Sequence, residues 1–145
     1  MGRDRAHLSA CALALCLLLL ADAAVAKPVA RVAIENATAG PMRLSPGADL
    51  IGTAVPALPA EIAPGSRVGP FSIASPFPSA AGGRFAYADA QGRRCAVIIS
   101  RTRTTLSGSF SWPNAAANAD RGLACRAEIL EATPDGGFSV LIRLE

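Results

Sequence analysis

Histidine is almost missing from this chain: the single one, His7, lies in an N-terminal stretch that we expect to be removed. Without histidine, Ser-His-Asp and Cys-His mechanisms and ordinary zinc sites are excluded. Of 11 acidic residues, Asp4 and Asp22 fall in the same stretch, and the other nine are scattered singly. Neither a paired-carboxylate site nor a calcium loop is indicated. The sequence predicts a protein that is not an enzyme and has no cofactor and no metal.

Aromatic residues and charge are also scarce. Aromatic residues make up 5% of the chain, and the formal net charge is only +3. So small a charge, spread along the chain, gives no reason to expect a nucleic-acid partner. The one tryptophan, Trp112, is expected in the core, where a lone tryptophan of a sandwich usually lies. Its place before Pro113 at a strand end makes an exposed, ligand-contacting ring the alternative.

The N-terminus has the pattern of a secretory signal. Arg3 and Arg5 precede an apolar run over 8–21, and the stretch ends on the small residues of 24–26. This run is shorter than the roughly 20 residues that span a bilayer. We therefore expect cleavage near Ala26, with residues 27–145 secreted or periplasmic and forming a single domain.

Four cysteines become two once the signal is removed. Cys11 and Cys16 lie in the signal, and Cys95 and Cys125 remain. In an oxidising compartment two such cysteines are expected to pair. A bridge that closes a loop of about 30 residues would stabilise the fold by roughly 3–4 kcal/mol. A thiol nucleophile, the alternative, would need an activating base that this chain lacks.

Apolar residues alternate with polar ones nearly everywhere after residue 27. This period of two is typical of strands with one buried face, and dense Pro and Gly punctuation disfavours long helices. The predicted fold is all-β, a single antiparallel β-sandwich with short strands and one disulfide. The expected core residues are Val32, Ile34, Phe71, Ile73, Phe85, Val97, Ile99, Val140 and Ile142.

Turn residues define the connections. Gln91-Gly92 and Asp135-Gly136-Gly137 are predicted to turn hairpins. Asn36-Ala37-Thr38 has the letters of a glycosylation site, but we interpret it as a polar turn, after which Met42 and Leu44 form a short partner strand. The alanine-rich stretch is expected to be a loop over 113–122, followed by a strand.

Four residues are the candidate ligand or membrane contacts: Trp112, Phe110, Arg101 and Arg103. With Arg93 and Arg94, the two arginines bracket the strand that holds Cys95. They would form a cationic rim there, although ordinary solvated strand ends are the favoured interpretation.

One stretch of the chain is similar to a known family. The residues that carry the likeness are Ile34–Thr38, Leu50–Gly52, Pro59, Ile62–Ser66, Phe71, Ser75, Gly82-Gly83 and Tyr87. In this pattern the chain resembles the aegerolysin-like group of small β-sandwiches, which includes bacterial members associated with insecticidal crystals. It departs from many members in lacking their early-loop aromatic cluster, and the cysteine pair is not part of the pattern. The resemblance implies an antiparallel sandwich that binds a lipid or membrane surface without catalysis.

The functional expectation is a secreted, non-enzymatic binding module. Loops at one end of the sandwich would engage a lipid or membrane surface or another exported protein. The alternative is a periplasmic structural or inhibitor-like protein that binds a protein partner through a strand edge.

Overall fold

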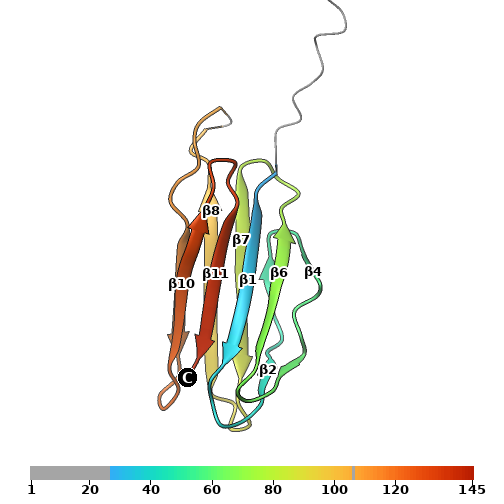
Figure 1. Cartoon of the computed structure of the whole chain (residues 1–145), viewed down its shortest axis with the longest axis vertical. Helices are drawn as coiled ribbons and strands as arrows, with labels where there is room; N and C mark the ends of the chain where they lie inside the picture. Colours follow the sequence, from blue (N-terminus) through green and yellow to red (C-terminus); the bar gives the residue numbers. More distant parts are fainter. Residues whose placement is uncertain (1–26, 106) are drawn as a thin grey trace, which may run out of the picture.

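A computed structural model of the protein describes residues 27–105 and 107–145. These residues form strands and connecting loops, without a helix, in two stacked sheets (Figure 1). The predicted signal over residues 1–26 lies outside the described residues. In the part that is described, no helix is long and apolar enough to cross a membrane. The all-β two-sheet prediction is confirmed.

The first sheet, nearer the viewer in Figure 1, has five strands in the order β10-β11-β1-β6-β4. Its strands are β1 (Val29–Asn36), β4 (Thr53–Val55), β6 (Arg67–Ala74), β10 (Cys125–Ala132) and β11 (Phe138–Leu144). The second sheet has six strands, with β5-β2-β7-β8-β9 in order and β3 paired to β7. Its strands are β2 (Met42–Leu44), β3 (Asp49–Leu50), β5 (Glu61–Ile62), β7 (Ala80–Ala88), β8 (Arg94–Thr102) and β9 (Asn114–Ala119).

The core lies between the sheets and uses the predicted alternation. All nine expected core residues are buried. Val32 of β1 stands beside Val140 of β11, and Ile34 stands beside Ile142, so neighbouring strands present their apolar side chains in register. Both predicted hairpins are also present, between β7 and β8 and between β10 and β11.

One pair of strands departs from a purely antiparallel sandwich. β1 pairs with β11 in parallel, and every other ladder in the described chain is antiparallel. β1 and β11 both start at the end of the sandwich where the 133–137 hairpin lies (Figure 1). The first and last strands of the described chain therefore run in the same direction where they pair inside the first sheet.

The turn after β1 is confirmed, but its expected strand partner is wrong. Asn36 is buried; its Nδ2 donates to the carbonyls of Gly40 and Ile62, each at 2.9 Å, and its Oδ1 accepts from the Thr38 amide at 3.0 Å. The turn carries the chain into the other sheet, where β2 pairs with β5 and β7. A local turn signal does not reveal which sheet receives the next strand.

The predicted loop over 113–122 is wrong for most of its length. Residues Asn114–Ala119 form β9, which pairs with β8 from Cys95↔Ala119 to Ser100↔Asn114. Alanine and asparagine have low β propensity, so the segment gave a weak strand signal. It is a strand because the exposed edge of β8 offers backbone partners to it.

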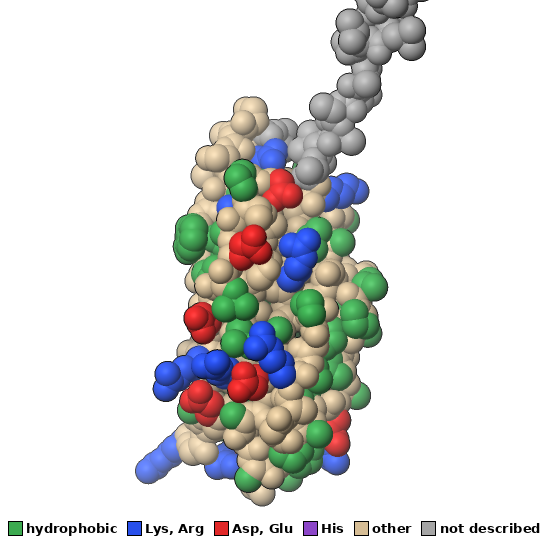
Figure 2. Space-filling view, in the orientation of Figure 1, with side chains coloured by type: hydrophobic (Ala, Val, Ile, Leu, Met, Phe, Trp, Pro, Cys, Tyr) green, Lys and Arg blue, Asp and Glu red, His purple; other side chains and the backbone are tan. Residues whose placement is uncertain are grey.

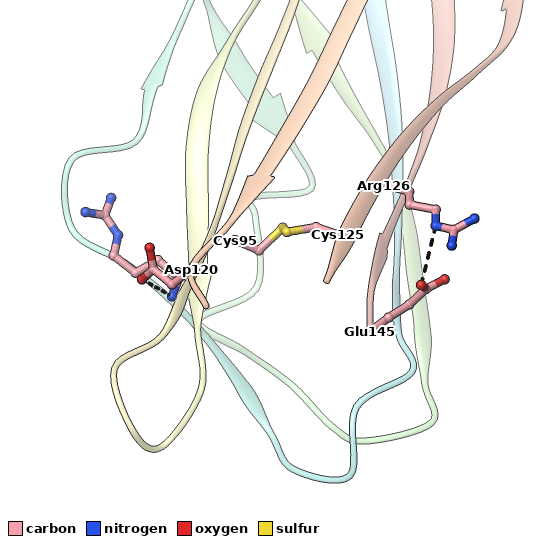
Figure 3. The surroundings of a disulfide bond; sticks show 6 residues. Cys95, Asp120, Cys125, Arg126 and Glu145 are labelled. Atoms are coloured by element: carbon pink, nitrogen blue, oxygen red, sulfur yellow. Dashed lines mark hydrogen bonds and ion pairs between the residues drawn. A yellow bond between two sulfur atoms is a disulfide. The ribbon is translucent and has the colours of Figure 1, made fainter. Parts of the chain in front are cut away.

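The disulfide prediction is confirmed. Cys95 of β8 is bonded to Cys125 of β10, with their Cα atoms 6.0 Å apart, so the bridge ties the second sheet to the first (Figure 3). It lies at the end opposite the 133–137 hairpin, near the C-terminus. A disulfide fits an extracellular or periplasmic location.

Candidate functional site

Three connections meet at the end of the sandwich that is distant from the disulfide (Figure 1). They are the 75–79, 103–113 and 133–137 connections, and we call this region the loop end. The Arg103 amide donates to the Ser79 carbonyl at 2.7 Å, which joins the first two. The Ser75 amide donates to the Pro28 carbonyl at 3.3 Å, so the start of the described chain is held there too.

Arg101 holds two segments of the loop end together. Its side chain is 6% exposed, although it was predicted as a surface contact. Nε donates to the Ser111 carbonyl at 2.8 Å, and one terminal nitrogen donates to the carbonyls of Thr133 at 2.7 Å and Gly137 at 2.5 Å. A guanidinium is suited to this task because its donors are held in a rigid fork. Arg101 thus joins the 103–113 segment to the 133–137 hairpin and is not available to a ligand.

The charge of Arg101 is balanced largely by carbonyl oxygens. Burial lowers its pKa, and the negative charge of Asp135 opposes that shift. Asp135 accepts from the Thr133 hydroxyl and, at 3.1 Å, from the Gly137 amide. These bonds and the nearby Arg101 hold the pKa of Asp135 below its usual value. Two charged side chains therefore hold the 133–137 hairpin: Arg101 donates to its carbonyls, and Asp135 accepts from the Thr133 hydroxyl and the Gly137 amide.

Phe110 is the second candidate contact that lies inside. It is 9% exposed, and its ring has the Arg101 guanidinium carbon 5.6 Å and the Arg103 guanidinium carbon 4.4 Å from its centroid. A Cβ added at Gly136 would come 2.5 Å from this ring. Cation–π attraction and the absence of a side chain at Gly136 explain why the ring fits beneath the hairpin.

Trp112 is exposed over 74% of its surface, so the favoured core position is wrong and the ring is exposed, as in the alternative; its contact with a ligand stays a prediction. The reason is one extra residue in the segment that faces β8. Arg103 opposes Phe110, and Ser100 opposes Asn114. Between these two pairs, residues 101–102 on one side face three residues, 111–113, on the other. Such a bulge reverses the alternation of side chains. Phe110 and Pro113 therefore point inward and Trp112 points out.

A second exposed aromatic residue, Phe77, was missed by the sequence analysis. It lies on the 75–79 connection and is 57% exposed. Its amide donates to the Ser75 hydroxyl at 3.0 Å, so the turn that carries it is ordered locally. The signal was available, because prolines flank Phe77 on both sides and remove it from any strand alternation.

The four arginines around β8 do not form one rim. Arg93 bonds to Asp89 and to the Gly122 carbonyl at the disulfide end, whereas Arg101 and Arg103 belong to the loop end. On the face of the first sheet, Figure 2 shows acidic and basic side chains interspersed. Electrostatics therefore give the molecule no strongly charged face in this view, and the apolar rings are the distinctive feature of the loop end.

An open cleft of about 500 Å³ lies along the β3 and β4 segments, and neither exposed ring lines it. It is lined mainly by apolar residues, including Leu44, Leu50, Ala54 and Leu58. Its walls bring together no acid–base pair, and in the described residues no group of three or more His, Cys, Asp or Glu side chains could hold a metal ion. Tyr87 is also engaged structurally: its hydroxyl donates to the Pro59 carbonyl at 2.9 Å, and burial raises its pKa.

No protein-family model matches this chain, and no curated protein matches its sequence. The aegerolysin-like resemblance therefore stays a prediction. Any functional assignment has to rest on the loop end itself, where two exposed aromatic rings stand on connections that buried side chains and backbone bonds hold in place.

Proposed function

We propose that this protein is an exported, non-catalytic binding module whose loop end adsorbs to a lipid surface. The observation that carries the proposal is the position of its aromatic residues. Five of the seven are buried, and the two exposed ones, Phe77 and Trp112, both lie at the loop end. Exposed rings gathered in one region are typical of an interaction surface, and tryptophan favours the boundary between water and lipid.

The surroundings of the rings support this proposal. Arg101 fixes the segment next to Trp112, so little conformational entropy would be lost when the ring enters a membrane interface. Arg101 and Arg103, which lie against the Phe110 ring, also give the loop end positive charge, which would favour anionic headgroups at low salt. The resemblance to aegerolysin-like proteins implies the same role, and the disulfide fits an exported protein.

Vesicle co-sedimentation tests the proposal. The protein is mixed with phosphatidylcholine vesicles, with and without phosphatidylglycerol, at two salt concentrations. Trp112→Ala and Phe77→Ala should each lower the partition coefficient, by roughly tenfold for the tryptophan, because burial of a large apolar side chain contributes about 1.5–3 kcal/mol. Ile98→Ala is the matched control, since Ile98 is 49% exposed but lies on β8 in the middle of the second sheet.

Two results would contradict the proposal. One is an equal loss of binding in the Ile98 control, which would indicate non-specific adhesion. The other is no binding to any of these vesicles. The second result would favour the alternative function, a periplasmic structural or inhibitor-like protein that binds a protein partner.

A further inference from the structure

The edge strand β9 leaves backbone groups unused. Asp120 donates its amide to the Arg94 carbonyl at 2.9 Å, so the alternation of an antiparallel ladder directs residues 118, 116 and 114 toward β8. The N–H and C=O groups of Ala115, Ala117 and Ala119 therefore point away from β8. Within the described chain β9 pairs with β8 alone, so no second strand takes up these groups.

Two other sheet edges in the described chain, β4 and β5, are protected against pairing, and β9 is not. β4 has three residues and is followed by Pro56, and β5 has two residues between Pro59 and Pro64. Short strands and prolines are the usual protections of a sheet edge. β9 has six residues, all alanine or asparagine, without a charge or a proline.

The neighbouring edge, β10, is open on the same side. Ala124 and Glu145 exchange both backbone hydrogen bonds, at 2.6 and 2.8 Å, so Cys125, Ala127 and Ile129 direct their backbone groups away from β11. β10 is charged on its outer face, with Arg126 and Glu128 both exposed. Arg126 reaches Glu145 at 3.5 Å (Figure 3), and Glu128 makes no ion pair with any described residue.

The disulfide sets the two edges level with each other. Cys95 opposes Ala119 in the β8–β9 ladder and is bonded to Cys125, so Ala119 and Cys125 lie at one height. Two residues further toward the loop end, Ala117 is level with Ala127. An axis perpendicular to the sheets can therefore pass near both alanines.

We propose that this side of the sandwich binds a second copy of the same chain, edge to edge, around a two-fold axis near Ala117 and Ala127. β9 would pair antiparallel with β9 of the second copy, Ala115 opposite Ala119, which gives the free groups about six hydrogen bonds.

The charges on β10 favour a second copy of this chain as the partner of this edge. Centred on Ala127, the same axis sets Arg126 opposite Glu128 of the second copy, and Glu128 opposite its Arg126. Both cross-strand pairs join opposite charges, whereas an arbitrary foreign strand would match neither. The interface is small compared with the 1,200–2,000 Å² of a stable complex, so association is weak and is expected at about 10 μM to 1 mM.

Sedimentation velocity without lipid tests this pairing. The wild type should change from monomer to dimer over that concentration range. Arg126→Glu and Glu128→Arg should each raise the dissociation constant roughly tenfold, because each sets like charges opposite each other. An equimolar mixture of the two variants should dimerise again, because both cross-strand pairs regain opposite signs. Arg67→Glu, which makes the same charge change on β6, should leave dimerisation unchanged.

A backbone variant gives a second test. The Ala117 amide points away from β8, so Ala117→Pro removes an outward donor and leaves the β8–β9 ladder intact. It should raise the dissociation constant at least about tenfold, with unchanged circular dichroism. If this variant does not fold, the mixing experiment alone decides. A wild type that stays monomeric at 1 mM, or a mixture that stays as monomeric as its components, would overturn the proposal.

Discussion

Replacing Arg101 tests whether the loop end is held as the structure indicates. Arg101→Ala removes three hydrogen bonds to the carbonyls of Ser111, Thr133 and Gly137, and it also removes the packing of the guanidinium against Phe110. A hydrogen bond from a charged donor contributes about 1.5–3 kcal/mol, and bonds that share one donor group are not additive. We therefore expect the free energy of unfolding to fall by about 3 kcal/mol.

Urea denaturation measures this loss, and thermal denaturation should show a lower Tm by about 4 °C for each kcal/mol. Arg101→Lys keeps the charge but cannot reach three carbonyls from one ammonium, so most of the loss should remain. Arg84→Ala is the control, because the Arg84–Asp49 pair is exposed and such pairs contribute about 0–1 kcal/mol. Trp112 fluorescence anisotropy should fall only in the Arg101 variants. A free energy of unfolding for Arg101→Ala within about 0.5 kcal/mol of the wild-type value would refute this role of Arg101.

Three further predictions follow from the disulfide, Asp135 and the β9 edge. Reducing Cys95–Cys125 should lower the free energy of unfolding by about 3–4 kcal/mol, measured by urea denaturation with and without reductant. The pKa of Asp135 in the folded state lies below its ordinary value of 3.8, so the ionised carboxylate stabilises the fold above that pH, and this stabilisation is lost as the pH falls through the folded-state pKa. The difference in free energy of unfolding between the wild type and Asp135→Asn should therefore shrink below about pH 4. If both proposals hold, the two loop ends of an antiparallel dimer point in opposite directions, so the wild type should increase vesicle turbidity, whereas Ala117→Pro should bind vesicles without clustering them.

The strands with large apolar side chains could be predicted from the sequence. In Phe138–Leu144 every second residue is a large apolar one, and these residues are buried as expected. β9 could not be found in this way, because its alanines and asparagines differ too little in size and polarity to show a period of two. The pairing of β1 with β11 was also out of reach, since partners so distant in sequence are chosen by the topology of the whole chain.

At the candidate site, two of the four residues predicted as ligand contacts are buried. Arg101 and Phe110 are internal supports, a role that depends on the 133–137 hairpin, which is distant in sequence. Trp112 is exposed because one extra residue opposite β8 shifts the alternation of buried and exposed side chains. The sequence around Trp112 contains no signal for that bulge. Phe77, between two prolines, could have been found.

The fluorescence of Trp112 tests the central claim most directly, because it is the only tryptophan in the chain and lies at the loop end. Titration with vesicles that contain brominated lipids reports whether the ring enters the membrane interface. The proposed adsorption predicts a blue-shifted emission, quenching by the brominated lipids and protection from aqueous iodide. Emission that keeps its wavelength and stays fully accessible to iodide at saturating lipid would contradict it.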